Sequence, residues 1–272
     1  MQHLQLLVAV ALATALGATP APARAQSLPP LGQDERGWRH AASVFLFAPL
    51  RTTGTSTVAG QSVELDLDIG DVLDVLEFAA SGRYEAWNGN IGIIVDANYV
   101  GIEQDTTLPS PLGARLDVDV RQKWFGVLGA FRVMNGTYGD SKKRYAIDLQ
   151  GGLRYNSIRQ EIELTNPGPG SPPVLGGDQN WIEPVIGARG MWRLNQKWTG
   201  IASVELGGFG TGGNDLQIGA NVGFDYQPWE NTALTFGYRY FGVDYSDTLS
   251  SGEFAYDVDQ HGPYFGIKYF IQ

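Results

Sequence analysis

The sequence predicts an all-β fold, an antiparallel transmembrane β-barrel, from three observations. Apolar and polar residues alternate along one segment after another, as in residues 217–226 and 234–240. Alternation with a period of two is typical of strands whose two faces meet different environments. The polar face carries charge, and a secretory signal precedes the segments. An apolar outer face around a polar interior is the pattern of an outer-membrane barrel.

The N-terminal segment, residues 1–25, has the features of a secretory signal peptide. Residues 4–16 form a mostly apolar stretch, and residues 23–25 (Ala-Arg-Ala) supply an A-x-A cleavage site. The apolar stretch is too short to span a bilayer as a helix. Residues 26–37 follow as a leader with Pro and Gly that we expect to be disordered, and residues 38–272 are predicted to form the barrel.

Composition excludes several kinds of chemistry. The 272 residues include no Cys, so the chain has neither disulfides nor thiolate sites. Acidic residues outnumber basic ones by 29 to 19, which disfavours nucleic acid as a partner because phosphate contacts need clustered Lys and Arg. A mean hydropathy of −0.15 is low for a helical membrane protein but ordinary for a barrel, where only every second residue faces lipid.

We predict ten strands, with eight or twelve as alternatives. The predicted strands cover residues 38–50, 77–87, 91–104, 116–133, 144–163, 181–194, 197–209, 215–227, 231–246 and 258–271. Alternation over residues 63–69 allows an extra hairpin, which would give twelve, and residues 71–76 allow one helical turn. A short first strand, or a break between 197 and 227, would give eight.

Connection lengths predict the orientation in the membrane. Short turns at 88–90, 195–196 and 228–230 alternate with longer loops such as 51–76 and 164–180. In outer-membrane barrels the short turns are periplasmic, so an even strand number places both termini in the periplasm. Five tryptophans lie at the predicted periplasmic strand ends, where an aromatic girdle is expected. These are Trp38, Trp87, Trp192, Trp198 and Trp229.

The candidate functional feature is a set of charged residues assigned to the lumen by strand alternation. The predicted lumen charge network is Arg83, Glu85, Asp96, Arg121, Lys123, Asp148, Arg154, Glu183, Arg189, Glu205, Arg239 and Lys268. The interior of a ten-stranded barrel is narrow, and charges inside it need partners. The favoured interpretation is therefore a structural network that blocks the lumen. The alternative is a narrow channel whose selectivity these charges set.

Other candidate sites are weaker. Acidic doublets such as Asp117 with Asp119 favour a solvated extracellular rim over a divalent-cation site, because no spacing matches a defined cation loop. We therefore predict no metal and no cofactor. A hydrolase would need His261 paired with Asp257 or Asp259, since it is the only histidine expected at the extracellular end. We predict no catalytic residues and no enzymatic activity.

Several motifs in the last third of the chain resemble a known group of proteins. They include Trp181-Ile-Glu-Pro184, Gly187-Ala-Arg189 and Gly237-Tyr-Arg-Tyr240. The chain resembles outer-membrane β-barrel proteins of Gram-negative bacteria, most of them without an assigned function. In pattern it is similar to the small-barrel class that includes the OmpA transmembrane domain and the OmpW-like porins. The resemblance implies the barrel and its location, and it implies no substrate.

These observations lead to a functional expectation. We expect a non-enzymatic outer-membrane barrel, either a structural surface protein or a narrow passive pore. The alternatives are an extracellular-loop binding module, such as an adhesin or a binder of lipopolysaccharide or divalent cations, and last an outer-membrane hydrolase. The expected partners are outer-membrane lipid, lipopolysaccharide and the barrel-assembly machinery, without nucleic acid. The sequence leaves the oligomeric state open.

Overall fold

The computed structural model describes residues 37–58, 60–107, 115–165, 174–249 and 252–271. The predicted signal peptide and most of the predicted leader therefore lie outside the described residues. The elements are β1 (Arg39–Phe47), β2 (Arg51–Val58), β3 (Gln61–Asp68), α2 (Ile69–Val75), β4 (Leu76–Asn88), β5 (Ile91–Thr107), β6 (Arg115–Tyr138), β7 (Lys143–Thr165), β8 (Val174–Arg193), β9 (Trp198–Thr211), β10 (Asn214–Tyr226), β11 (Thr232–Leu249) and β12 (Gly252–Ile271).

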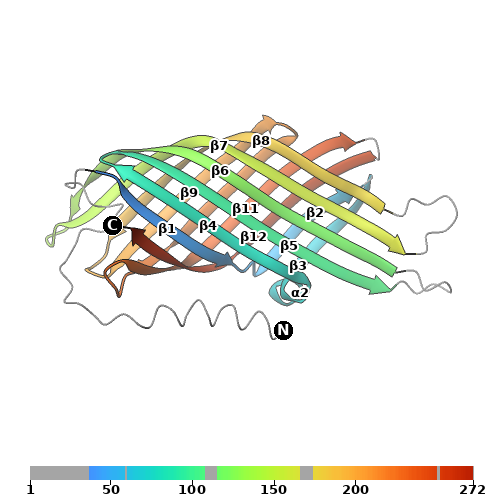
Figure 1. Ribbon diagram of the computed structural model, residues 1–272, viewed down its shortest axis with the longest axis horizontal. Helices are drawn as coiled ribbons and strands as arrows, with labels where there is room; N and C mark the ends of the chain where they lie inside the picture. Colours follow the sequence, from blue (N-terminus) through green and yellow to red (C-terminus); the bar gives the residue numbers. More distant parts are fainter. Residues whose placement is uncertain (1–36, 59, 108–114, 166–173, 250–251, 272) are drawn as a thin grey trace.

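Ten of the strands form a closed antiparallel ring (Figure 1). Its order is β1 followed by β4 to β12, and the pairing of β1 with β12 closes it. Closure gives every ring strand a partner on each side, so the section in which all ten strands are paired has no edge, which is the condition for crossing a bilayer with strands. The prediction of a ten-stranded antiparallel barrel is confirmed.

β2 and β3 form a hairpin that extends the wall of the barrel without widening the ring. β1 pairs with residues 264–271 of β12, and β2 pairs with residues 255–261 of the same strand. Between them, the Ala48 amide donates to the Pro263 carbonyl at 3.0 Å and the Leu50 amide donates to the His261 carbonyl at 2.9 Å. The extra hairpin therefore exists, but the ring keeps ten strands.

The short helix α2 connects this hairpin to β4. The Asp68 carboxylate accepts from the Gly70 amide at 2.7 Å and from the Asp71 amide at 3.1 Å, and the Asp71 carboxylate accepts from the Asp68 amide at 3.0 Å. This capping box explains why the chain turns into a helix at this point. The helical turn expected near residues 71–76 is confirmed. No helix within the described residues is long and apolar enough to cross a membrane.

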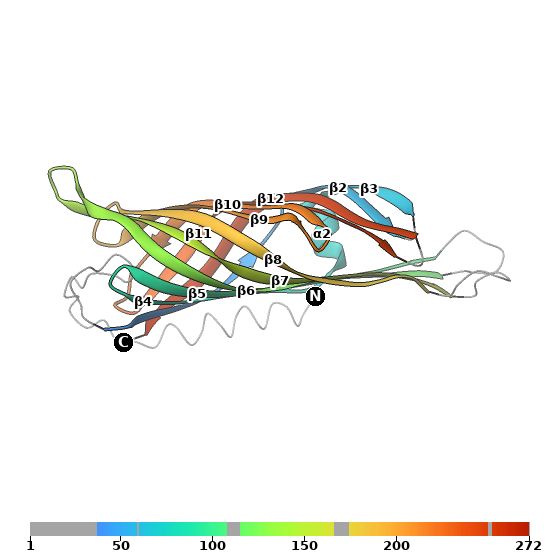
Figure 2. The ribbon, with the colours of Figure 1, turned by 90° about the horizontal axis from the view of Figure 1, so that it is seen from above.

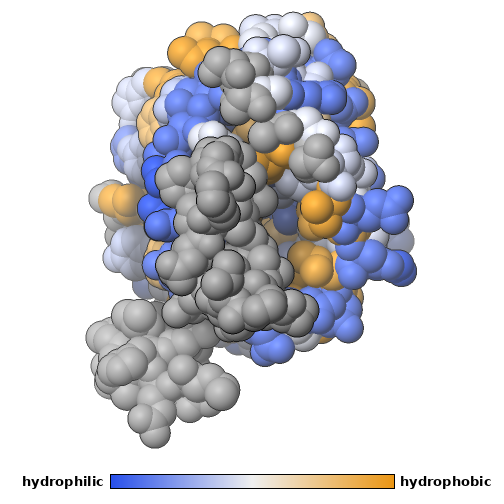
Figure 3. All heavy atoms as spheres, turned by 90° about the vertical axis from the view of Figure 1, so that its right-hand side faces the viewer, coloured by the Kyte–Doolittle hydropathy of each residue, from blue (hydrophilic) through white to orange (hydrophobic). Residues whose placement is uncertain are grey.

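The two ends of the barrel differ. The tight-turn end holds the start of β1, the end of β12 and the short turns, such as the one between β4 and β5. At the opposite, long-strand end, β5 to β8 form one group and β12, β2 and β3 another, as Figure 2 shows. Figure 3 looks at this end, and hydrophilic residues occupy much of its described rim.

The outer face of the ring carries an apolar belt. Large apolar side chains point away from the lumen and are widely exposed, with Val44 at 66%, Leu153 at 59% and Ile182 at 57%. Other members are Leu46, Ile91, Ile93, Phe125, Val127, Phe131, Leu149, Ile186, Val222, Phe224 and Phe265. A continuous apolar surface of this kind is not tolerated in water by a monomer. It fits contact with lipid acyl chains.

Candidate functional site

Ten of the twelve predicted network residues point into the lumen. Their side chains share the inward face of each strand with buried neighbours such as Ser81, Leu128 and Val185. The ten are Arg83, Glu85, Asp96, Asp148, Arg154, Glu183, Arg189, Glu205, Arg239 and Lys268.

One group of ion pairs lies nearest the tight-turn end and centres on Arg189 of β8. Its guanidinium donates to both oxygens of Glu85, at 2.6 and 2.9 Å, and to Asp148 at 3.0 Å. Arg132 of β6 donates from Nε to the other oxygen of Asp148 at 2.8 Å. Trp87 lies beside the group, and its indole nitrogen donates to Glu85 at 3.0 Å. Forked Arg–carboxylate pairs of this kind fix geometry as well as charge.

A second group centres on Glu205 of β9. Arg154 of β7 donates to it at 2.6 Å, and the Gln150 amide donates to its other oxygen at 2.8 Å. Arg83 of β4 lies 3.5 Å from Glu205 and 3.9 Å from Asp96. β4 and β9 stand five places apart in the ring of ten, so the Arg83–Glu205 pair joins opposite walls of the barrel.

Two further carboxylates, Glu183 and Asp225, have partners outside these two groups. Glu183 accepts from the Trp181 indole at 2.9 Å and from the Asn214 amide. Lys268 of β12 contacts Asp225 of β10 at 2.5 Å. Glu183 is fully buried, and the neutral donors of Trp181 and Asn214 offset the cost of removing its charge from water.

An aromatic layer covers the charged groups toward the long-strand end. Its members are Ile158, Trp181, Phe241, Val243, Tyr245, Phe254, Tyr256 and Val258, with Leu65 and Trp124 packed against them. Trp124 of β6 stacks on Phe241 of β11 with ring centroids 5.1 Å apart, and Trp181 of β8 stacks on Tyr245 of β11 at 4.2 Å. β6 and β11 also stand five places apart in the ring, so these rings meet across the lumen.

Arg239 lies between the charged groups and the aromatic layer. Its guanidinium carbon is 5.4 Å from the ring centres of Trp124 and Phe241 and 5.5 Å from that of Phe47. Cation–π contacts of a desolvated guanidinium are worth about 2 kcal/mol. Arg239 lies inside the barrel, but the prediction that it is ion-paired there is wrong for the described residues, because its contacts are aromatic rings.

The lumen assignment of Arg121 and Lys123 is wrong. Both lie on the outward face of β6, in line with Phe125 and Val127, while Trp124 points inward. The prediction placed this strand one residue out of register, and a shift of one residue exchanges the two faces. The same error missed Arg132, which is buried in the lumen. The bulky apolar residues at odd positions of β6 were the signal that identifies its lipid-facing side.

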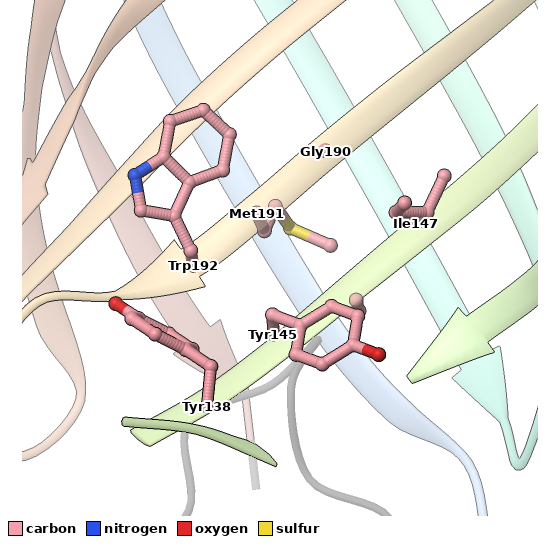
Figure 4. Close-up of a pocket in the computed structure, with 7 residues that line it drawn as sticks. Tyr138, Tyr145, Ile147, Gly190, Met191 and Trp192 are labelled. Atoms are coloured by element: carbon pink, nitrogen blue, oxygen red, sulfur yellow. The ribbon is translucent and has the colours of Figure 1, made fainter. Parts of the chain in front are cut away.

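Aromatic residues gather on the outer face at the tight-turn end, but one tryptophan of the predicted girdle lies elsewhere. An apolar hollow of about 360 Å³ lies between β6, β7 and β8, and Figure 4 shows Tyr138, Tyr145 and Trp192 around it. The Tyr138 hydroxyl donates to the Arg193 carbonyl at 2.6 Å. This fits an interfacial girdle. Trp87 does not belong to it, because its ring is buried in the lumen.

The candidate hydrolytic pair does not form. His261 Nδ1 lies 2.6 Å from the Tyr238 hydroxyl, and the Asp259 carboxylate accepts from Tyr240 instead. His261 lies on the outward face of β12, away from the lumen. Within the described ranges, no three His or acidic residues are grouped to hold a metal ion. The absence of catalytic activity stays a prediction.

A closed ring, an apolar outer belt and a polar, paired interior together define the class of this protein. It is an integral β-barrel of the outer-membrane type, because such a ring crosses a bilayer without exposing unpaired backbone to lipid.

Comparisons with known proteins find similar barrels only among solved structures. Neither a family model nor a curated protein matches the sequence. Among solved structures, the chain is similar to Ail, the attachment invasion locus protein of Yersinia pestis, with 9% identity and a TM-score of 0.33 over 87% of this chain and 100% of that chain. It is similar to the translocator domain of the autotransporter NalP from Neisseria meningitidis, with 16% identity and a TM-score of 0.38 over 87% and 90%. It is also similar to Neisserial surface protein A, with 12% identity and a TM-score of 0.31 over 85% of this chain and 96% of that chain. Similarities this low carry no argument about function.

Proposed function

We propose that the protein is a non-enzymatic, closed outer-membrane barrel, a structural surface scaffold rather than a passive pore. The observation that carries the proposal is contact between opposite walls at two levels of the lumen. The Arg83–Glu205 pair joins them at 3.5 Å in the charged region, and the Trp124–Phe241 stack joins them at 5.1 Å in the aromatic layer.

The energetics of the lumen favour a closed state. The Arg132 and Asp148 side chains are each 1% exposed, and Arg154 is 6% exposed. Separating one member of such a pair from its partner costs about 3–5 kcal/mol, because a charge is left buried and unpaired. A water-filled path through the charged region requires several such separations at once, so open states should be rare.

Solute permeation tests the proposal. Vesicles that contain the refolded protein should show no more swelling in small sugars and amino acids than vesicles without protein. The positive control is a variant that removes the contacts between opposite walls at both levels, with Trp124→Ala and Phe241→Ala in the aromatic layer and Arg83→Ala and Glu205→Ala in the charged region. Swelling by wild-type protein at the level of this variant would overturn the closed barrel.

We also propose that both termini are periplasmic and that the long-strand end faces the outside. Tight turns and the girdle around Trp192 lie at one end, while the long strands and the β2–β3 hairpin lie at the other. The natural chain has no Cys, so single introduced thiols report orientation cleanly. A membrane-impermeant maleimide should label Thr248→Cys in intact cells and should not label Ser141→Cys. The reverse labelling pattern would show that the barrel has the opposite orientation in the membrane.

A second candidate function is surface binding through the β2–β3 hairpin. β3 pairs with β2 alone among the described strands, so its other edge keeps free backbone donors and acceptors. A free edge is a template for strand addition by a partner. Bacteria that display a barrel without residues 52–67 should then lose adhesion to cultured cells that the full protein confers. Unchanged adhesion would remove this candidate.

A further inference from the structure

A polar hollow lies on the outer face of the barrel, directly beyond the apolar belt. It has a volume of about 300 Å³ and is formed by β5 to β8. Its lining residues are Tyr99, Arg121, Lys123, Ser157, Arg159, Asp178 and Asn180. Three of them are basic, and two of these, Arg121 and Lys123, are the residues that the sequence wrongly assigned to the lumen.

Strand register places the hollow relative to the membrane. Phe125, Tyr155 and Ile182 form one outward row across β6, β7 and β8. Lys123 and Asn180 belong to the next outward row, two residues closer to the long-strand end. This spacing is about 7 Å at the rise of a β-strand. Phe125 is 50% exposed and Ile182 is 57% exposed, so the belt reaches the edge of the hollow.

The basic groups keep unused hydrogen-bond donors. Lys123 is exposed and has no ion pair with any described residue. The Nε atoms of Arg121 and Arg159 are buried, but the two side chains are 43% and 37% exposed, so a ligand would reach their outer guanidinium nitrogens. Tyr155 donates its hydroxyl proton to the side-chain oxygen Oδ1 of Asn180 at 2.8 Å, which leaves the side-chain nitrogen Nδ2 of Asn180 as a donor. An oxyanion in the hollow would meet these donors from three strands.

Nearby carboxylates restrict what the hollow accepts. Arg121 contacts Asp119 at 2.6 Å, and Arg159 contacts Glu161 at 2.5 Å and Asp178 at 3.7 Å. The hydrogen bond to Glu161 raises the pKa of the Arg159 guanidinium, so this residue stays charged. Since three carboxylates balance three cations, the net field is too weak to hold a free anion. Binding therefore needs a ligand that also contacts the belt.

We propose that this hollow binds the phosphorylated sugar headgroup of an outer-leaflet glycolipid, the lipid A part of lipopolysaccharide. The phosphate would meet Arg121, Lys123 and Arg159, because guanidinium groups match phosphate oxygens in a forked geometry. The acyl chains would run along Phe125 and Ile182. The assignment rests on the proposed orientation, in which the long-strand end faces the outside.

Native mass spectrometry of the refolded mature protein in detergent tests the site. The probes are bisphosphorylated lipid A and the same lipid A without phosphate. The test variant is R121Q/K123Q/R159Q. The matched control is K142Q/K143Q/K197Q, which removes the same charge at the tight-turn end. Lipid A binding by the test variant should be at least about tenfold weaker than by wild type, while the control variant should bind like wild type.

Three results would overturn the proposal. One is equal binding by the test variant and wild type, with heat-modifiable migration showing that both are folded. Another is equal weakening in the test and control variants, which indicates general attraction of anions. The last is phosphatidylglycerol binding as tightly as lipid A with the same dependence on the test variant. Because detergent has no leaflets, these results do not depend on orientation, which the maleimide labelling reports separately.

Discussion

Arg189 shows how single residues hold this lumen together. It bridges Glu85 of β4 and Asp148 of β7, and Asp148 in turn holds Arg132 of β6. Four strands are therefore tied through one pair of guanidinium groups. Buried charges of this kind are costly alone and tolerable only as a set, so each member makes the others possible.

Removing Arg132 should destabilise the barrel strongly. Arg132→Ala leaves Asp148 buried with one fewer cation, and the expected loss is about 3–5 kcal/mol in the free energy of unfolding. Urea-dependent unfolding in lipid vesicles measures it. The control is Arg51→Ala, whose ion pair with Asp66 is 56% and 66% exposed, and the expected loss there is below about 1 kcal/mol. Similar losses for the two variants would mean that the network has no special structural role.

At the scale of residues, the sequence predicted most of the charged side chains that face the lumen. Ten of the twelve charged residues were assigned correctly because alternation along each strand fixes the face of every side chain. Arg121 and Lys123 were not, because beyond the belt the outward face of β6 meets headgroups and water, where charge is as acceptable as in the lumen. The contacts between opposite walls, such as Trp124 with Phe241, depend on how the ring closes and leave no local pattern in the sequence.

At the scale of elements, close approach of β10 and β11 depends on paired glycines. Gly223 and Gly237 lie opposite each other in register. A Cβ atom on Gly237 would lie 2.2 Å from the Val222 carbonyl oxygen and 2.5 Å from the Gly223 Cα. Contacts this short require the backbones to separate, since neither neighbour is the flexible end of a side chain.

Gly237→Ala should therefore impair folding. The expected result is a smaller fraction of heat-modifiable, folded protein on a gel after refolding. Gly219→Ala is the matched control in β10, because a Cβ atom there meets only Glu205 Cβ at 3.9 Å, an ordinary contact. Equal folded fractions for the two variants would show that close packing of β10 on β11 is not needed.

The β2–β3 hairpin should be dispensable for the ring. Deleting residues 52–67 joins Arg51 to Asp68, which are register partners, and leaves the β1–β12 and β1–β4 pairings in place. We expect the shortened protein to keep heat-modifiable migration. Loss of the folded band would mean that the hairpin helps to close the barrel.

The sequence predicted the elements better than their roles. All ten ring strands were expected close to where they lie, and the alternation at 63–69 correctly indicated an added strand. The same alternation occurs in a strand that joins a ring and in one that extends its wall. The two kinds of strand differ only in their pairing. β1 and β2 pair with successive parts of β12, which is a long-range contact that no local pattern shows.

For the whole molecule, three concentric regions have separate roles. The apolar belt contacts lipid, the closed ladder satisfies the backbone, and the paired charges and stacked rings fill the interior. A passive pore would need a hollow interior in place of the paired charges and stacked rings. A structural barrel benefits from filling it, since contacts between opposite walls stiffen the ring.

The most direct test of the closed lumen is single-channel recording of the refolded, heat-modifiable protein in planar bilayers. We expect no discrete conductance steps from wild-type protein. We expect steps from the variant that lacks Trp124, Phe241, Arg83 and Glu205, because it loses the contacts across the barrel in both the aromatic layer and the charged region. Steps from wild-type protein whose ion selectivity changes with Glu205→Gln would contradict the account, since they would show that ions pass the charged network.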